Sequence, residues 1–187
     1  MITRRTLTRT TMAAAAVSPF AGVLMSETAA AADLANTIYL TLPSGRVTIV
    51  LRPDLAPKTC AQIKTLTGQG FYNGCEFFRV IAGFMAQTGD PSNTGTGGSP
   101  LPNVPAEFTT KASFLTGALG MARTNDPNSG NSQFFICFAP ATFLDDKYTL
   151  FGQVTEGMEF VDQIKKGQGQ SGRVADPTKI IKMELAA

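Results

Sequence analysis

The feature that most constrains the fold is a series of short β-strand segments that starts at Thr37 and continues almost to the end of the chain. The first two, Thr37–Leu42 and Arg46–Leu51, are rich in β-branched residues and flank a Pro-Ser-Gly turn, as in a hairpin. Six more segments of this kind follow: Glu76–Ile81, Phe84–Thr88, Ala118–Ala122, Gln133–Ala139, Leu150–Val154 and Lys179–Leu185. Many short strands predict a mainly antiparallel barrel or sandwich.

Two helices are expected beside these strands. Pro57 can open the first, which ends at about Gly68 or Gly70. The second covers Gly157–Lys166, where Met158, Val161 and either Ile164 or Lys165 share a face, and Gly167 ends it. The 155 residues from Asp33 to Ala187 contain no linker or repeat and have the size of one domain, 33–187.

The first 32 residues have the three parts of a secretory signal. Basic residues at the start precede an apolar run from Met12 to Met25 and small residues that end at Ala32, where we expect cleavage. The run is short for a membrane span, and no cysteine at its end could be lipidated. Arg4 and Arg5 resemble a twin-arginine signal, although the general secretory route and an unstructured tail are alternatives. The expected location is the bacterial periplasm.

Charge excludes some classes of partner. Of the 16 Lys and Arg and the 14 Asp and Glu, three arginines and one glutamate precede Asp33, so residues 33–187 contain 13 of each sign. A balanced chain has no bulk field to hold nucleic acid or an anionic membrane. We therefore expect no nucleic-acid partner and no membrane association after signal cleavage, and we expect a monomer.

The sequence contains no histidine, which removes imidazole-based triads and most catalytic zinc sites. Asp90, Asp126, Asp145 and Asp146 lie in turn sequences, where turn formation explains them. The glycine-rich stretch 89–100 lacks the Lys and Ser or Thr of a P-loop and is interpreted as an ordered surface loop that can approach a ligand closely. No metal or cofactor is expected.

Three cysteines, Cys60, Cys75 and Cys137, do not form a closed disulfide set. Cys137 lies in an apolar strand and is interpreted as a small core residue. In an oxidising compartment Cys60 and Cys75 could form a disulfide, but they could equally stay thiols, and their spacing does not decide between the two.

Arg79 is a single cation in an apolar run, and such a charge needs either a partner or a function. Period-2 alternation places Gln133 and Phe135 on one face of their strand, and Met85 and Gln87 on one face of another. If these strands meet, one apolar surface carries two amides and a guanidinium. The alternative is that Arg79 only extends from a barrel rim with its stem on apolar neighbours.

Such a surface has donors and apolar walls but no acid, base or nucleophile. The reaction that needs no more is rotation about a prolyl peptide bond, whose barrier of about 18–20 kcal/mol comes from amide resonance. Twisting the bond leaves a lone pair on the proline nitrogen, and a guanidinium donor aimed there binds the twisted state preferentially.

The residues 77–91, 95–98, 118–122, 131–139 and 150–164 together resemble a cyclophilin, a peptidyl-prolyl cis-trans isomerase, over most of Thr37–Leu185. The resemblance implies a closed eight-stranded antiparallel β-barrel with a helix over each end, and it implies that Arg79 is the catalytic arginine. Together with the export signal, the resemblance predicts an exported isomerase that acts on flexible X-Pro segments of envelope proteins. A non-catalytic chaperone or assembly module that holds such segments is the alternative, and a hydrolase is disfavoured.

Carried over residue by residue, the resemblance implies a substrate-binding surface around Arg79. It assigns the proline pocket to Phe84, Met85, Phe135 and Leu144, substrate orientation to Gln87 and Gln133, and contact with the preceding residue to Ala122. Phe78 and Tyr148 stand where the family commonly has histidines, Phe143 where many members have tryptophan, and Arg123 where an asparagine is common. These departures resemble bacterial members and bear on ligand preference, including a weak response to cyclosporin.

Overall fold

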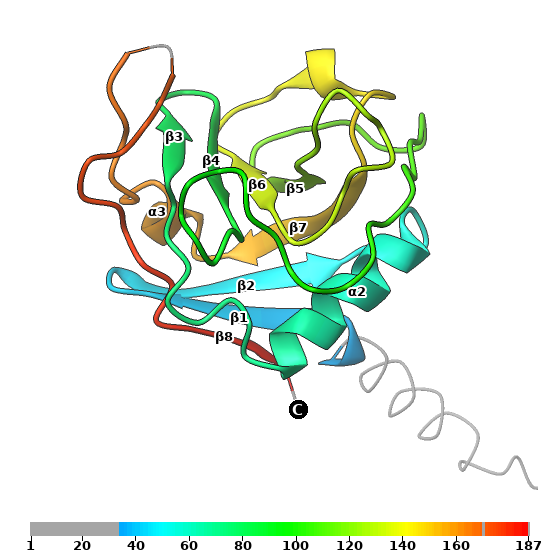
Figure 1. Ribbon diagram of the computed structural model, residues 1–187, viewed down its shortest axis with the longest axis horizontal. Coiled ribbons are helices and arrows are strands. Elements are labelled where there is room, and N and C mark those ends of the chain that lie inside the picture. Colours follow the sequence, from blue (N-terminus) through cyan, green and yellow to red (C-terminus); the bar gives the residue numbers. More distant parts are fainter. Residues whose placement is uncertain (1–33, 170, 187) are drawn as a thin grey trace, which may run out of the picture.

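The computed structural model describes residues 34–169 and 171–186, so the predicted export signal lies outside the described residues. Eight strands form one sheet in the order β3-β4-β6-β5-β7-β2-β1-β8, and each neighbouring pair is antiparallel. Their bounds are β1 Thr37–Leu42, β2 Gly45–Leu51, β3 Arg79–Ile81, β4 Met85–Thr88, β5 Ala118–Met121, β6 Phe134–Cys137, β7 Leu150–Glu156 and β8 Lys182–Leu185. Figure 1 shows the sheet strongly curled, and the prediction of a mainly antiparallel β protein is confirmed.

The two outermost strands, β3 and β8, begin later than the sequence predicts. The residues before them still meet, because Glu76 forms an isolated antiparallel bridge with Lys179, and Phe77 N donates to Thr178 O over 2.9 Å. Phe78 O instead accepts from Val174 N, which lies on a different segment. The first residues of each predicted strand thus pair with other segments than its last residues do. This change of partner interrupts the strands.

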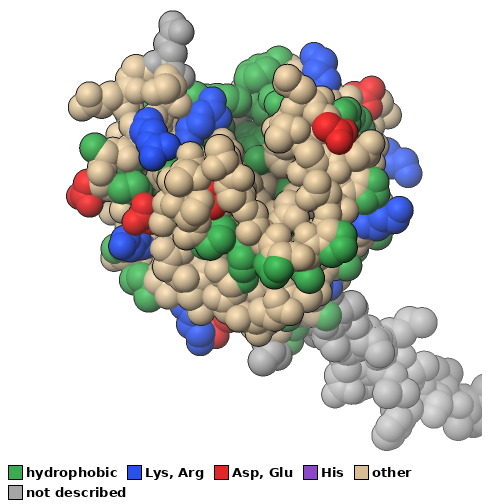
Figure 2. Space-filling view, viewed as in Figure 1, with side chains coloured by type: hydrophobic (Ala, Val, Ile, Leu, Met, Phe, Trp, Pro, Cys, Tyr) green, Lys and Arg blue, Asp and Glu red, His purple; other side chains and the backbone are tan. Residues whose placement is uncertain are grey.

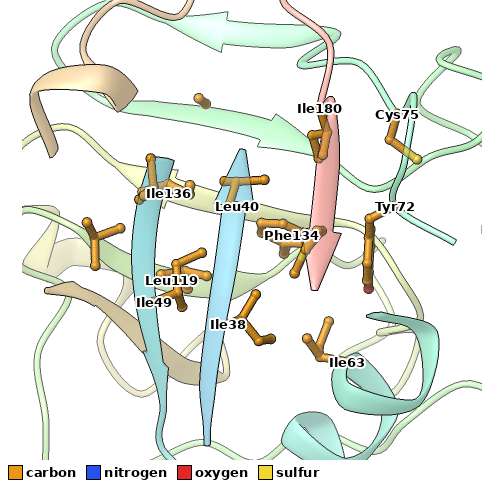
Figure 3. Close-up of a cluster of buried hydrophobic side chains, with 14 of the residues drawn as sticks. Ile38, Leu40, Ile49, Ile63, Tyr72, Cys75, Leu119, Phe134, Ile136 and Ile180 are labelled. Carbon is orange, nitrogen blue, oxygen red and sulfur yellow. The ribbon is translucent and has the colours of Figure 1, made fainter. Parts of the chain in front are cut away.

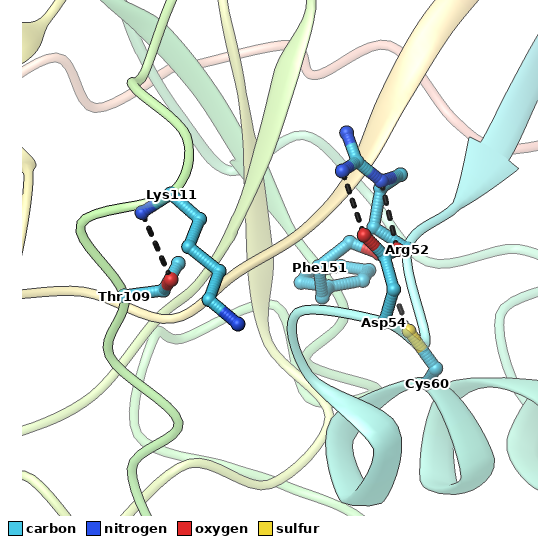
Figure 4. A network of polar contacts seen from close by, with 6 residues as sticks. All are labelled: Arg52, Asp54, Cys60, Thr109, Lys111 and Phe151. Carbon is cyan, nitrogen blue, oxygen red and sulfur yellow. Dashed lines mark hydrogen bonds and ion pairs between the residues drawn. The ribbon is translucent and has the colours of Figure 1, made fainter.

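Helix α2 spans Pro57–Gly68, as predicted from Pro57. Its first turn is capped by a residue that is distant in the sequence. The Glu107 carboxylate accepts hydrogen bonds from Lys58 N and Thr59 N over 2.9 and 2.8 Å. Figure 4 shows Cys60 of α2 directed at the Phe151 carbonyl of β7, with Sγ 3.3 Å from that oxygen. These contacts fix α2 against the sheet.

The second predicted helix, Gly157–Lys166, is largely wrong. α3 covers only Met158–Val161, after Gly157 in the left-handed region. Lys165 N donates to Thr178 Oγ1 over 3.1 Å, and Gly167 N donates to Val80 O over 2.9 Å. Because these N–H groups have partners outside the segment, the helix does not continue, although Val161 and Ile164 are buried as expected. A further short element, the 3-10 helix η1, covers Thr142–Leu144.

Two apolar clusters lie on opposite faces of β6 and its neighbours. Phe134 and Ile136 belong to the main core, which includes Leu40, Ile63 and the other side chains of Figure 3. The side chains that alternate with them, Phe135 and Cys137, join Met85 and other residues in a second cluster. The alternation predicted for residues 132–138 is confirmed, and it gives β6 one face for the core and one for the site.

All three cysteines are free thiols and all three are buried. Burial raises the pKa of Cys60 and of Cys75 to about 11, and that of Cys137 to about 12. The structure thus decides the question that the spacing left open, in favour of thiols rather than a Cys60–Cys75 disulfide.

Candidate active site

The register of three adjacent strands sets the site. Arg79 of β3 lies opposite Gln87 of β4, and Gln87 lies opposite Phe135 of β6. Residues paired in this way present their side chains on the same face of a sheet. One apolar surface therefore carries the guanidinium and an amide, as the sequence predicted.

A cavity of about 290 Å³ opens on this face, and its lining contains ten of the eleven predicted site residues. They are Arg79, Phe84, Met85, Gln87, Ala122, Arg123, Phe135, Phe143, Leu144 and Tyr148. Figure 2 shows hydrophobic side chains gathered near the top of the molecule, between the β3–β4 turn and η1 as placed in Figure 1, with Lys and Arg side chains beside them. The remaining predicted residue, Gln133, lines an adjoining cavity.

The apolar part of the cavity is rigidly packed. Met85, Phe135 and Leu144 are buried, and the Phe135 ring stacks on Phe114 with centroids 5.8 Å apart. Gly120 lies opposite Phe135 across β5 and β6, and a Cβ atom there would lie 2.2 Å from the Phe135 ring. Only glycine allows the ring to lie this close to β5.

Arg79 is held by neutral acceptors. Its Nε donates to Ser171 O over 3.1 Å and its Nη1 donates to Gln87 Oε1 over 3.1 Å. No ion pair between described residues involves Arg79. The side chain is half-buried, and these hydrogen bonds fix its orientation. Because no carboxylate in the described part of the chain pairs with it, its charge is not neutralised.

The two predicted glutamines extend this contact into a chain. Gln87 Nε2 donates to Gln133 Oε1 over 2.9 Å, and Gln133 Nε2 donates to Gly95 O and Gly97 O over 3.1 and 2.8 Å. Each amide is therefore oriented by its neighbours, and the chain links Arg79 to the glycine-rich loop.

Asp90 organises that loop. Its buried carboxylate accepts hydrogen bonds from Ser92 and from the backbone N–H groups of Gly95 and Gly97. Burial alone would raise the pKa of Asp90, but the hydrogen bonds from Ser92, Gly97 and Gly95 outweigh it and lower the pKa to about 2. The turn role predicted for Asp90 is confirmed, and the loop presents its glycines to the site.

A second cavity, of about 520 Å³, adjoins the first and shares Gln87, Ala122 and Arg123 with it. Most of its lining is polar and was not predicted from the sequence: Gly95, Thr96, Gly97, Gly98, Ser99, Asn103, Thr124, Ser129 and Asn131. The only signal was the glycine-rich stretch 89–100, whose predicted close approach to a ligand fits this position.

The residues that depart from the usual family pattern differ in whether they line the apolar cavity. Phe143 on η1 is 61% exposed, and its ring centroid is 5.3 Å from that of Phe84. Tyr148 meets Phe135 edge-on with centroids 5.9 Å apart and carries the Arg123 guanidinium on its face. Phe78 is buried and packs beneath Gly95, so it is not part of the cavity lining.

Residues 34–169 and 171–186 contain no group of three or more His, Cys, Asp or Glu side chains placed to hold a metal ion. The same residues form no helix with the length and apolar character needed to span a bilayer. A curled antiparallel sheet with a fixed guanidinium and the Gln87 amide at an apolar cavity defines the class of β proteins with a concave, mostly apolar pocket and a few polar groups that can orient a ligand.

Comparisons with known proteins agree with this class. The sequence model of the cyclophilin type peptidyl-prolyl cis-trans isomerase family matches residues 37–185, and the chain belongs to this family. A protein from Brucella suis, named "Probable peptidyl-prolyl cis-trans isomerase", is 51% identical over 86% of this chain and 88% of its own length. A peptidyl-prolyl cis-trans isomerase-like protein from Aspergillus oryzae is 38% identical over 81% of this chain and 96% of its own.

Solved structures of cyclophilins are also similar. One from Hirschia baltica has a TM-score of 0.73 with 27% identity and covers 82% of this chain and 74% of its own. One from Cryptosporidium parvum, crystallised in the presence of the dipeptide Ala-Pro, has a TM-score of 0.74 with 26% identity and covers 81% of this chain and 99% of its own. The protein is therefore a cyclophilin-type prolyl isomerase, and the resemblance inferred from the sequence is confirmed.

Proposed function

We propose that Arg79 catalyses rotation about X-Pro bonds in substrates bound across the apolar cavity. The observation that carries this is the fixed, unneutralised guanidinium of Arg79 beside buried Met85 and Phe135. Its hydrogen bonds use Nε and Nη1, which donates to Gln87 Oε1 and contacts Met85 Sδ, and this leaves the Nη2 donors for a ligand.

The proline ring enters the cavity against Phe84, Met85, Phe135 and Leu144, where burial of its apolar surface anchors the segment. As the X-Pro bond twists, resonance is lost and the proline nitrogen becomes a hydrogen-bond acceptor. Arg79 donates to that nitrogen in the twisted state and has no such acceptor in the planar ground states. No proton is transferred and no covalent bond is made or broken.

The two glutamines orient the substrate and the arginine. Gln87 holds Nη1 of Arg79, and Gln133 holds Gln87. Ala122, which lines both cavities, contacts the residue before proline. This preorganisation lowers the cost of aligning donors at the moment of reaction.

We also propose that the curled sheet closes into an eight-stranded barrel with α2 and α3 over its ends. The support is the contact between the segments before β3 and β8, which includes the Glu76–Lys179 bridge and the hydrogen bond from Phe77 N to Thr178 O. The protein acts as a monomer in this proposal, which light scattering of the mature chain tests.

A non-catalytic module that only holds Pro-containing segments remains the alternative function. The two differ in turnover, because a binding module at a small molar fraction cannot change the cis-trans exchange rate of excess peptide. Exchange spectroscopy on a short X-Pro peptide with about 1% protein measures that rate. Unchanged exchange together with measurable peptide binding would favour the module.

We propose further that the protein is exported and acts on clients in the periplasm. The support is the three-part pattern of residues 1–32, which lie outside the described residues. The mature protein recovered from a bacterial host should begin near Asp33. Replacing Arg4 and Arg5 with Lys should block export if the twin-arginine route is used, and unimpaired export would indicate the general route.

A further inference from the structure

Arg123 is the one charged residue that lines both cavities. It follows β5 and borders the apolar cavity together with Phe135 and Tyr148, and the polar cavity together with Thr124 and Asn131. A peptide that runs from one cavity into the other must therefore pass its side chain.

The guanidinium is fixed before any substrate arrives. Nε and Nη2 both donate to Lys147 O, over 3.2 and 3.0 Å, and Nη1 donates to Thr124 O over 2.9 Å. Its central carbon lies 4.5 Å from the centroid of the Tyr148 ring. A cation held on an aromatic face in this way loses little conformational entropy when it binds an anion.

The charge of Arg123 has no protein counterion. No ion pair in the described ranges involves it, and the linings of the two cavities contain Arg79 and Arg123 but no carboxylate. The nearby Asp126 carboxylate accepts from Asn128 N within its own turn. Lys147 adds a further positive charge at the rim, where its Nζ donates to Phe143 O over 3.1 Å.

From this arrangement we infer that Arg123 gives the enzyme a preference for segments with Asp or Glu within two residues of the proline. Its hydrogen bonds to Lys147 O and Thr124 O use three of the five guanidinium N–H groups, and two remain for a carboxylate. Adjacent residues of the substrate are about 3.8 Å apart, so a Glu side chain on a flanking residue can reach the junction of the cavities. This inference rests on the proposed binding of X-Pro segments at the site.

The expected preference is modest because Arg123 is half-buried and accessible to water. Exposed ion pairs contribute about 0.2–1 kcal/mol, which corresponds to a factor of up to about five in kcat/KM. Salt should reduce the preference, since the Debye length falls from about 30 Å at 0.01 M to about 3 Å at 1 M.

The test is a scan of short peptides in which Glu, Gln or Lys occupies each of the two positions before and after proline. For the mature protein at low ionic strength, we expect kcat/KM for Glu to exceed that for Gln by about two- to fivefold at one or more positions, with Lys below Gln. Arg123→Gln should bring the Glu to Gln ratio to about one, whereas Arg123→Lys should retain part of it. The ratio is informative whatever the change in absolute activity.

Arg46→Gln is the matched control. Arg46 lies on β2, outside both cavity linings, and its guanidinium also sits 4.5 Å from an aromatic centroid, that of Tyr39. Loss of this cation should leave the Glu to Gln ratio unchanged. Thermal unfolding of each variant checks that the fold survives.

A Glu to Gln ratio of one at every position in the wild type, or a ratio that survives Arg123→Gln, overturns the inference. Failure of the proposed function is a different result, namely no acceleration of any peptide. In that case the dissociation constants of the same peptides test the inference. Tighter binding of the Glu peptides that depends on Arg123 supports it, and the absence of such a preference refutes it.

Discussion

Arg79 and Gln87 lie directly opposite each other on β3 and β4, and Arg79 Nη1 donates to Gln87 Oε1 over 3.1 Å. The backbone register of the β3–β4 hairpin, together with the hydrogen bond from Arg79 Nε to Ser171 O, sets the direction of the guanidinium. Sites built on regular elements hold catalytic geometry better than sites on loops. The lone cation in an apolar stretch therefore has a partner that orients it without neutralising it.

The first prediction concerns this residue. Arg79→Ala should lower kcat/KM for a Pro peptide by about two to three orders of magnitude, which is comparable to the loss of one preorganised transition-state donor. The free energy of unfolding should change little because the side chain is only half-buried. Arg46→Ala, made as the control, should keep activity. If Arg79→Ala keeps most of its activity at unchanged stability, Arg79 is merely a rim residue.

The second prediction is that kcat/KM is nearly flat between about pH 6 and 8.5. The proposed mechanism transfers no proton, and the sequence has no histidine to titrate. Burial raises the pKa of the three thiols to about 11 or 12, above this range. Rates measured with an uncharged peptide should show this. A bell-shaped profile at constant stability would contradict the resonance-breaking mechanism.

Much of the site could be predicted because strands impose a strict period of two. That period placed Met85 and Gln87 on one face, and Gln133 and Phe135 on one face of another strand. The second helix could not be predicted well, since the N–H groups of Lys165 and Gly167 bond to Thr178 and Val80, far away in the sequence. The polar cavity was missed for a similar reason, because most of its lining comes from two loops that only the fold brings together.

The third prediction uses the lowered pKa of Asp90. Its folded-state pKa of about 2 lies below the unfolded value of about 3.9, so the ionised form stabilises the fold above about pH 4. That contribution, about 2 kcal/mol, is lost as the pH falls from about 4 to 2. Asp90→Asn should thus lower the free energy of unfolding at pH 7, and its difference from wild type should shrink toward pH 2.

Asp54→Asn provides the control for Asp90. Asp54 also has a lowered pKa, caused first by its hydrogen bond from Arg52, but its side chain is 59% exposed. An exposed ion pair contributes at most about 1 kcal/mol. Denaturant titrations of both variants should show the larger effect for Asp90, and equal effects would mean that the hydrogen bonds to its carboxylate add no net stability.

The final prediction concerns Phe143, where the resemblance to cyclophilins implies a weak response to cyclosporin. Many members that bind the drug tightly have tryptophan here, whose indole N–H can donate to a ligand carbonyl while its ring covers apolar surface. Phe143 is 61% exposed at the rim, with its ring against Phe84, so it offers apolar contact but no donor. A hydrogen bond missing from an otherwise buried carbonyl costs about 1–3 kcal/mol, a tenfold to hundredfold loss of affinity.

Phe143→Trp should therefore tighten cyclosporin inhibition at least several-fold. Its effect on kcat/KM for small peptides should be smaller, because three of the four residues of the proposed proline pocket, Met85, Phe135 and Leu144, are more deeply buried than Phe143. Inhibition constants and kcat/KM measured on the same preparations separate the two effects. Equal inhibition of both forms would assign control of the drug site to another departure from the family pattern, Tyr148 or Arg123, which stack on each other and also line the cavity.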